Sequence, residues 1–139
     1  MNTARVKDNR INDAKGVLRV YQLDFSGDNG WDTILEHIDT HKALLEKKHN
    51  IRADWFDYVF SWHEEVFLPL YRSISSRGYR RAFGDQKIGD LYLAVSDHWA
   101  YLKEKNPRAS AVEAAKSFLE HYGHGVGRYF SRFLVTTNW

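Results

Sequence analysis

The sequence predicts a mainly α-helical domain, with four to five helices packed as an irregular bundle and one N-terminal β-strand. Three observations support this fold class. Apolar residues recur at helical spacing after residue 30, a short stretch before it alternates apolar and polar residues, and 5 Trp, 8 Tyr and 8 Phe can fill a core. The length of 139 residues suits one domain at residues 16–139, after a polar, flexible N-terminus at residues 1–15.

The strand is expected at residues 17–25, where β-branched and aromatic residues alternate between two faces before a glycine-rich stop. A lone strand leaves backbone groups unpaired, so it needs a partner. The candidates are the C-terminal segment RFLVTT and the same strand of a second subunit. The strand therefore also motivates self-association as a dimer.

Helical spacing predicts three helices at residues 31–48, 53–75 and 86–104. Pro69 interrupts the second of them, because proline lacks an amide donor and clashes with the preceding turn, so a kink or a restart is expected there. Ser110 and Glu113 form a capping-box pattern that starts a fourth helix. The last segment, residues 126–139, fits either a helix or a strand.

The composition excludes several functional classes. There is no Cys, which rules out disulfides, thiolate zinc sites, thiol nucleophiles and iron–sulfur clusters. The net charge is only +2, and no apolar run approaches the roughly 20 residues of a membrane-spanning helix. The expectation is a soluble, cytoplasmic domain without a membrane partner.

Histidines supply the candidate metal ligands. His37 and His41 lie four residues apart and share a helix face, while His63 falls in the middle of an apolar face. In a bundle His63 and His98 could meet His41, and three inward imidazoles would suit a divalent metal. The alternative is that each imidazole bonds a backbone carbonyl or a Tyr hydroxyl, as core histidines commonly do. The candidate ligands are His37, His41, His63 and His98.

A second candidate site is the basic linker at residues 72–87. Tyr79 and Phe83 are interleaved with its charges, and basic residues between aromatics suit nucleic-acid backbones. The same charges could instead face the acidic pair Asp54 and Asp57, or an acidic partner, or simply be solvated. The basic residues are Arg72, Arg77, Arg80, Arg81 and Lys87, against the single acid Asp85.

No pattern indicates an enzyme. Glu64 and Glu65 follow His63 directly, but neighbouring helix positions do not face each other, so these three cannot act as one cluster. The glycine-rich stretch at residues 123–127 follows a helix rather than a strand, which removes the usual context of a dinucleotide loop.

Part of the chain, about residues 55–122, resembles an uncharacterised bacterial family of unknown function. That family is best known as the helical C-terminal portion of proteins whose N-terminal part looks like a lipopolysaccharide-kinase-type kinase. The resemblance implies a helical accessory module without catalytic residues. The residues that carry it are Trp62, Glu65, Val66, Phe67, Pro69, Ile74, His98, Glu104, Ala114 and Ser117.

A weaker pattern is similar to hemerythrin-like bundles that bind a di-iron centre. It comprises the His37–His41 pair, then His63 with its two glutamates, and later His98 and His121. The resemblance implies an iron site, but those families place a carboxylate where this chain has Phe67.

These observations favour a non-enzymatic helical interaction or regulatory module that binds a protein partner or itself. The first alternative is a metal- or O₂-binding histidine bundle. The second is nucleic-acid binding through the basic linker.

Overall fold

A computed structural model describes residues 3–123, which form seven α-helices, a 3-10 turn and a π-helical turn. The mainly helical fold class is confirmed. The expected alternatives for residues 126–139 lie outside the described residues. The elements are α1 (Thr3–Val17), η1 (Arg19–Tyr21), α2 (Gly30–Lys48), α3 (Trp55–Trp62), η2 (His63–Phe67), α4 (Leu68–Ile74), α5 (Arg77–Phe83), α6 (Ile88–Lys105) and α7 (Ala111–Tyr122).

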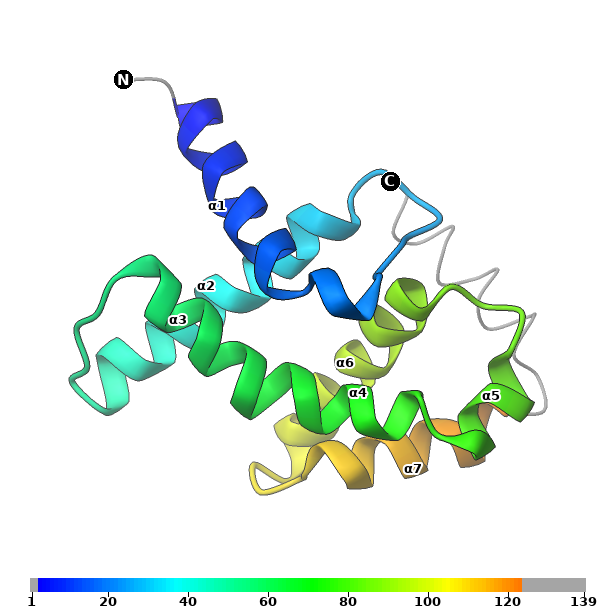
Figure 1. The fold of residues 1–139 in the computed structure, drawn as a ribbon. Coiled ribbons are helices and arrows are strands. Elements are labelled where there is room, and N and C mark those ends of the chain that lie inside the picture. The colour runs from blue at the N-terminus through cyan, green and yellow to red at the C-terminus, as the bar shows by residue number, and fades with distance from the viewer. Residues whose placement is uncertain (1–2, 124–139) are drawn as a thin grey trace.

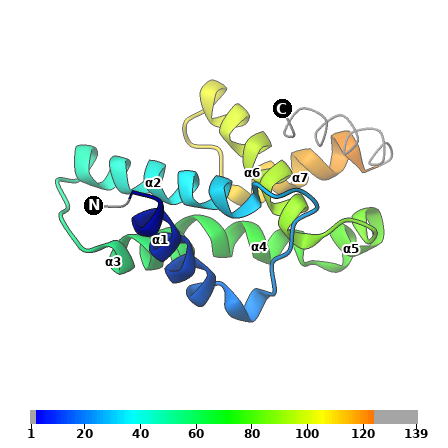
Figure 2. The ribbon, with the colours of Figure 1, turned by 90° about the horizontal axis from the view of Figure 1, so that it is seen from above.

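One long rod organises the molecule. Figure 1 shows α3, η2 and α4 as a nearly continuous rod through the middle of the fold. The helices α1 and α2 pack against α3, and α6 and α7 pack against α4. The view from above in Figure 2 shows the same division, with the N-terminal helices at one end of the rod and α7 at the other.

The rod contains a π-helical turn at the interruption expected from Pro69. The amide of Leu68 donates to the carbonyl of His63, five residues back. In an unbroken α-helix the ring of Pro69 would clash with the carbonyl of Glu65. That carbonyl would also lose its helical hydrogen bond, because proline has no backbone N–H to donate. A wider turn relieves that clash, and α4 restarts at Leu68 with proline in its first turn.

The core is built where the rod meets α6. Trp62, Phe67 and Tyr92 are fully buried, with ring centroids 5.5 Å apart for Trp62 and Phe67 and 5.1 Å apart for Phe67 and Tyr92. Burying large aromatic side chains is worth about 1.5–3 kcal/mol each. This cluster therefore stabilises the packing of α6 on the rod.

The expected N-terminal strand is wrong: no strand occurs within residues 3–123. The helix α1 extends to Val17, a hydrogen bond from Leu18 N to Ala14 O continues it, and η1 follows. Ala14 and Leu18 are buried and Tyr21 is partly buried. This spacing of four and three residues is helical, and it outweighs the two-residue alternation because the described chain provides no second strand to pair with.

Residues 22–29 form a loop that is fastened to the start of α6. Asp90 is only 4% exposed, and its carboxylate accepts hydrogen bonds from the backbone amide of Ser26, at 3.0 Å, and from the Ser26 hydroxyl. The Phe25 ring lies against Gly30 and Gly89, and a Cβ at either glycine would overlap it. The two glycines therefore form a slot for the ring.

The number of helices also exceeds the expected four to five. An additional helix, α1, occupies the N-terminal residues, the second expected helix is divided by the π turn, and the basic linker contains α5. The capping box at the start of α7 is confirmed, with Ser110 and Glu113 each bonding the other's backbone amide. No helix in the described part of the chain has both the length and the apolar character needed to cross a membrane.

Candidate functional site

The basic linker folds as a short helix that is anchored on one side. The Tyr79 hydroxyl donates to the backbone carbonyl of Ala115 in α7, and the rings of Phe83 and Phe118 lie 5.5 Å apart. Tyr79 is 3% exposed and Phe83 is 2% exposed. Because these two residues hold α5 against α7, the arginines of α5 face outward.

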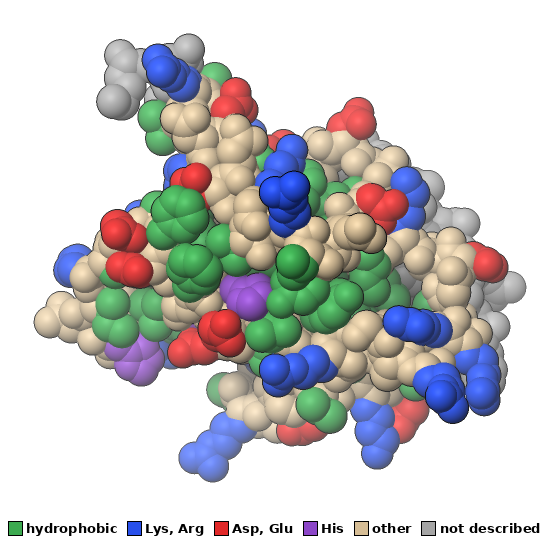
Figure 3. All heavy atoms as spheres, in the orientation of Figure 1, with side chains coloured by type: hydrophobic (Ala, Val, Ile, Leu, Met, Phe, Trp, Pro, Cys, Tyr) green, Lys and Arg blue, Asp and Glu red, His purple; other side chains and the backbone are tan. Residues whose placement is uncertain are grey.

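The outward side chains of this corner form the arginine face, which we define as Arg72, Arg77, Arg80 and Arg81. All four are exposed, Arg72 at the end of α4 and the others on α5. None of them takes part in an ion pair within residues 3–123. On the face drawn in Figure 3, basic side chains gather at the end of the molecule that carries α5.

Asp54 and Asp57, the two acids suggested as partners of the linker, lie far from the arginine face. Asp54 is the N-cap of α3 and accepts from the amide of Asp57, at the end of the rod opposite α5 (Figure 1). Lys87 does find an acid, since its Nζ lies 3.7 Å from Asp24 Oδ2. Lys87 is therefore separate from the four arginines.

The first two candidate metal ligands lie on α2, each against a different neighbour. Nε2 of His41 is 2.8 Å from Ser61 Oγ and 3.6 Å from Glu65 Oε2. The ring of His37 lies 6.2 Å from that of Tyr92. Burial is the largest influence on both imidazoles and lowers the pKa of each below the ordinary 6.5.

His63 bonds a tyrosine hydroxyl, which agrees with the non-metal alternative. Its Nε2 lies 2.7 Å from the Tyr21 hydroxyl. Its Nδ1 is buried and 3.3 Å from Glu64 Oε1, without the geometry of a hydrogen bond. Phe67 stacks on the imidazole at 5.8 Å. Phe67 is itself fully buried, so the position where a hemerythrin-like site needs a carboxylate is part of the core.

No group of three or more His, Cys, Asp or Glu side chains that could hold a metal ion occurs among residues 3–123. His37, His41 and His63 contact Tyr92, Ser61 and Tyr21, respectively. His98 contacts Ser117 instead. The geometry thus places the four imidazoles with four separate neighbours rather than around one point.

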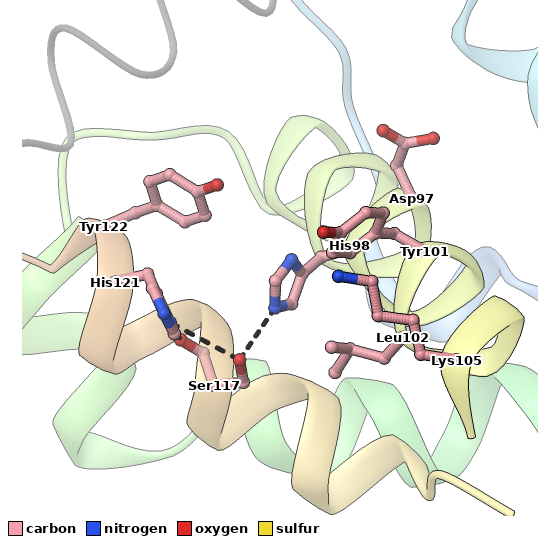
Figure 4. Close-up of a pocket in the computed structure, with 8 residues that line it drawn as sticks. All are labelled: Asp97, His98, Tyr101, Leu102, Lys105, Ser117, His121 and Tyr122. Carbon is pink, nitrogen blue, oxygen red and sulfur yellow. Dashed lines mark hydrogen bonds between the residues drawn. The ribbon is translucent and has the colours of Figure 1, made fainter.

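A cavity of about 520 Å³ lies between α6 and α7. Figure 4 shows the side chains of α6 facing those of α7 across it. The lining residues are Asp97, His98, Tyr101, Leu102 and Lys105 from α6, and Ser117, His121 and Tyr122 from α7.

Two imidazoles of this cavity converge on one serine. Nε2 of His98 lies 2.9 Å from Ser117 Oγ, and Nδ1 of His121 lies 3.5 Å from the same oxygen. Nδ1 of His121 is also 2.8 Å from the Ser117 carbonyl oxygen. A carbonyl only accepts, so this nitrogen carries the proton and Nε2 of His121 remains for other contacts.

The electrostatics of the cavity combine opposing influences. Burial, and then the charge of His121, lower the pKa of His98, while Asp97 raises it. On the same helix, a side-chain hydrogen bond to Tyr101 is the first cause of a raised pKa for Lys105. At neutral pH the cavity therefore holds a charged ammonium beside a His98 that favours its neutral form.

Within residues 3–123, the helix that carries Ser117 offers no oxyanion hole to the serine–imidazole pair. Ser117 lies within α7, so the backbone amides around it are engaged in helical hydrogen bonds and cannot form an oxyanion hole. The pair can accept and donate hydrogen bonds to a ligand, but this geometry does not activate the hydroxyl for attack on a carbonyl.

Sequence reasoning missed the cavity. Ser117 and His121 stand four residues apart, which places them on one helix face. That spacing was an available signal, but the meeting with His98 depends on how α6 packs on α7. Comparisons of the chain with protein-family models, with curated proteins and with solved structures found no match.

Proposed function

We propose that this protein is a non-enzymatic interaction module whose arginine face binds an acidic segment of a partner protein. The observation that supports the proposal is the set of four exposed arginines without an intramolecular acid in the described chain. Guanidinium groups bind carboxylates with two parallel hydrogen bonds and are weakly hydrated, which makes arginine well suited to interfaces.

The rigidity of α5 adds to this argument. Its buried side is tied to α7 by Tyr79 and Phe83, and its N-cap Ser76 accepts from the amide of Tyr79. A partner would therefore meet arginines on a preformed helix and would not have to order a loop, which lowers the entropic cost of binding. The likeness of residues 55–122 to a helical accessory module is consistent with such a role.

An acidic protein fits the arginine face better than nucleic acid does. The nucleic-acid hypothesis relied on aromatic rings that stack on bases, and Tyr79 and Phe83 are buried against α7 instead. The whole chain carries only +2, so the residues outside 72–87, taken together, include more acids than basic residues. A long polyanion would extend beyond the arginine face onto the surface of those residues, whereas a short acidic peptide would not.

Binding of a fluorescein-labelled octaglutamate peptide tests the proposal. We expect saturable binding that weakens as salt rises, because exposed charges are screened. Replacing Arg80 and Arg81 by Gln should weaken it by at least about fivefold. The matched control replaces Lys47 and Lys48 by Gln. These two lysines are another exposed basic pair in the last turn of a helix, so the affinity for the peptide should stay unchanged.

Two outcomes would overturn the proposal. Equal loss of binding in both double variants would show a response to net charge rather than to the arginine face. Tighter binding of a labelled DNA oligonucleotide than of the peptide, abolished by the Arg80 and Arg81 substitutions, would replace the protein partner by nucleic acid.

A further inference from the structure

We infer that the cavity between α6 and α7 binds a small organic anion that carries a phosphate or carboxylate head and a flat apolar body. The cavity volume of about 520 Å³ falls within the roughly 300–1,000 Å³ typical of ligand sites. This inference is independent of the arginine face, which lies on α4 and α5.

The anionic head follows from the groups that line the cavity. Lys105 and the imidazoles of His98 and His121 present nitrogen donors, and Ser117 adds a hydroxyl. Of the eight described residues that line the cavity, one is an acid, Asp97, and it is exposed. An anion suits these donors better than a cation does, since Asp97 is the single carboxylate among the described lining residues and Lys105 would repel a cation.

The apolar body follows from the rings around the donors. The rings of Tyr101 and Tyr122 lie 6.2 Å and 6.0 Å from that of His98, one on each side of the cavity. Leu102 adds an aliphatic side chain from α6. Figure 4 shows the two tyrosines coming from different helices with His98 between them, so a flat group could lie against one of these rings while its head reaches the donors.

The hydrogen bonds already present explain how the donors are aimed. His121 is held by the Ser117 carbonyl through Nδ1, which leaves Nε2 available. His98 is held by Ser117 Oγ through Nε2. Lys105 Nζ lies 4.7 Å from the centroid of the Tyr101 ring. Donors that are positioned before a ligand arrives lose less freedom on binding.

Titration with phenyl phosphate, followed by the imidazole NMR signals of the full chain, tests the inference. We expect saturable shifts at His98 and His121, and weaker binding of inorganic phosphate, which has the head without the ring. Benzoate distinguishes a carboxylate head from a phosphate head. Lys105→Gln should weaken phenyl phosphate binding by about fivefold. Lys48→Gln, an exposed lysine on α2, should not.

A second variant distinguishes loss of the ring contact from loss of folding. Tyr101 is half exposed, so Tyr101→Leu should fold normally. It should weaken phenyl phosphate binding more than inorganic phosphate binding, because the ring contact is lost for phenyl phosphate alone, whereas the placement of Lys105 changes for both anions. The inference is overturned if none of the three anions gives saturable shifts up to about 20 mM. It is also overturned if Lys105→Gln and Lys48→Gln behave alike.

Discussion

The Tyr21 hydroxyl lies 2.7 Å from Nε2 of His63 and so joins the 3-10 turn after α1 to the π turn in the rod. The Tyr21 ring also packs on Phe67 and Tyr71, at 4.9 Å and 4.7 Å between centroids. We expect Tyr21→Phe to lower the free energy of unfolding by about 1 kcal/mol, the usual net worth of one hydrogen bond. Urea denaturation measures it.

The control for this prediction is Tyr71→Phe, because Tyr71 also packs on Phe67 and its hydroxyl makes no hydrogen bond within the described chain. In a His63→Ala background, Tyr21→Phe should cost much less, since the partner is already gone. Equal costs in both backgrounds would mean that the hydroxyl and the imidazole are not coupled.

The slot for Phe25 gives a second prediction. Gly30→Ala should destabilise the fold by about 1–3 kcal/mol, because the new Cβ would overlap the Phe25 ring. In a Phe25→Ala background the same substitution should be neutral or stabilising, because the slot is then empty. Thermal unfolding of the four proteins tests this, and a constant cost in both backgrounds would contradict the overlap.

The fastening of the loop to α6 gives a third prediction. Asp90→Ala should cost about 2–3 kcal/mol, since it removes a buried carboxylate that accepts from the amide and the hydroxyl of Ser26. The exposed Asp85→Ala serves as the control and should cost little. Hydrogen exchange at the Ser26 amide provides a local measurement, and we expect it to accelerate in Asp90→Ala only.

Stability should decrease on acidification because of three histidines. Burial lowers the pKa of His37, His41 and His98 in the folded state below the ordinary 6.5. The unfolded chain then binds more protons than the folded one as pH falls below about 6.5, so the free energy of unfolding falls with it. Urea midpoints at about pH 7.5 and about pH 5.5 measure the slope.

In the variant His98→Gln, the free energy of unfolding should depend less steeply on pH, because Gln keeps a polar contact to Ser117 but cannot take up a proton. His98 is influenced by its burial, by His121 and by Asp97. Asp97→Asn should steepen the decrease, since Asp97 is the group that raises the His98 pKa. A profile that stays flat in the unaltered protein would contradict the role of burial.

The sequence predicted the helices that have strong periodicity and clear ends. The capping box at Ser110 and the interruption at Pro69 both correspond to local chemistry that acts within one turn. The position of His63 on an apolar face predicted that its imidazole needs a hydrogen-bond partner or a metal. The partner that it has, Tyr21, is 42 residues away and could not be identified from the local pattern.

What the sequence could not predict depends on packing between distant segments. Residues 17–25 satisfy a strand pattern, but Leu18 and Tyr21 also stand at helical spacing from Ala14, and the burial of Ala14 and Leu18 decides in favour of the helical turn. Similarly, Tyr79 and Phe83 look like a stacking surface among arginines until α7 covers them. The approach of His98 to Ser117 also depends on a helix contact that no local pattern encodes.

The π turn has an evolutionary consequence. A π-helical turn holds one residue more than the α-helical turn that it replaces. Trp62 lies before this turn and Leu70 lies after it, and both are buried, as is Phe67. Both halves of the rod therefore turn the same face toward the core. A homologous chain with a regular helix here would need one residue fewer to present the same faces. Such chains should align with a single-residue gap between His63 and Phe67, and a gap elsewhere in the rod would put its two halves out of register.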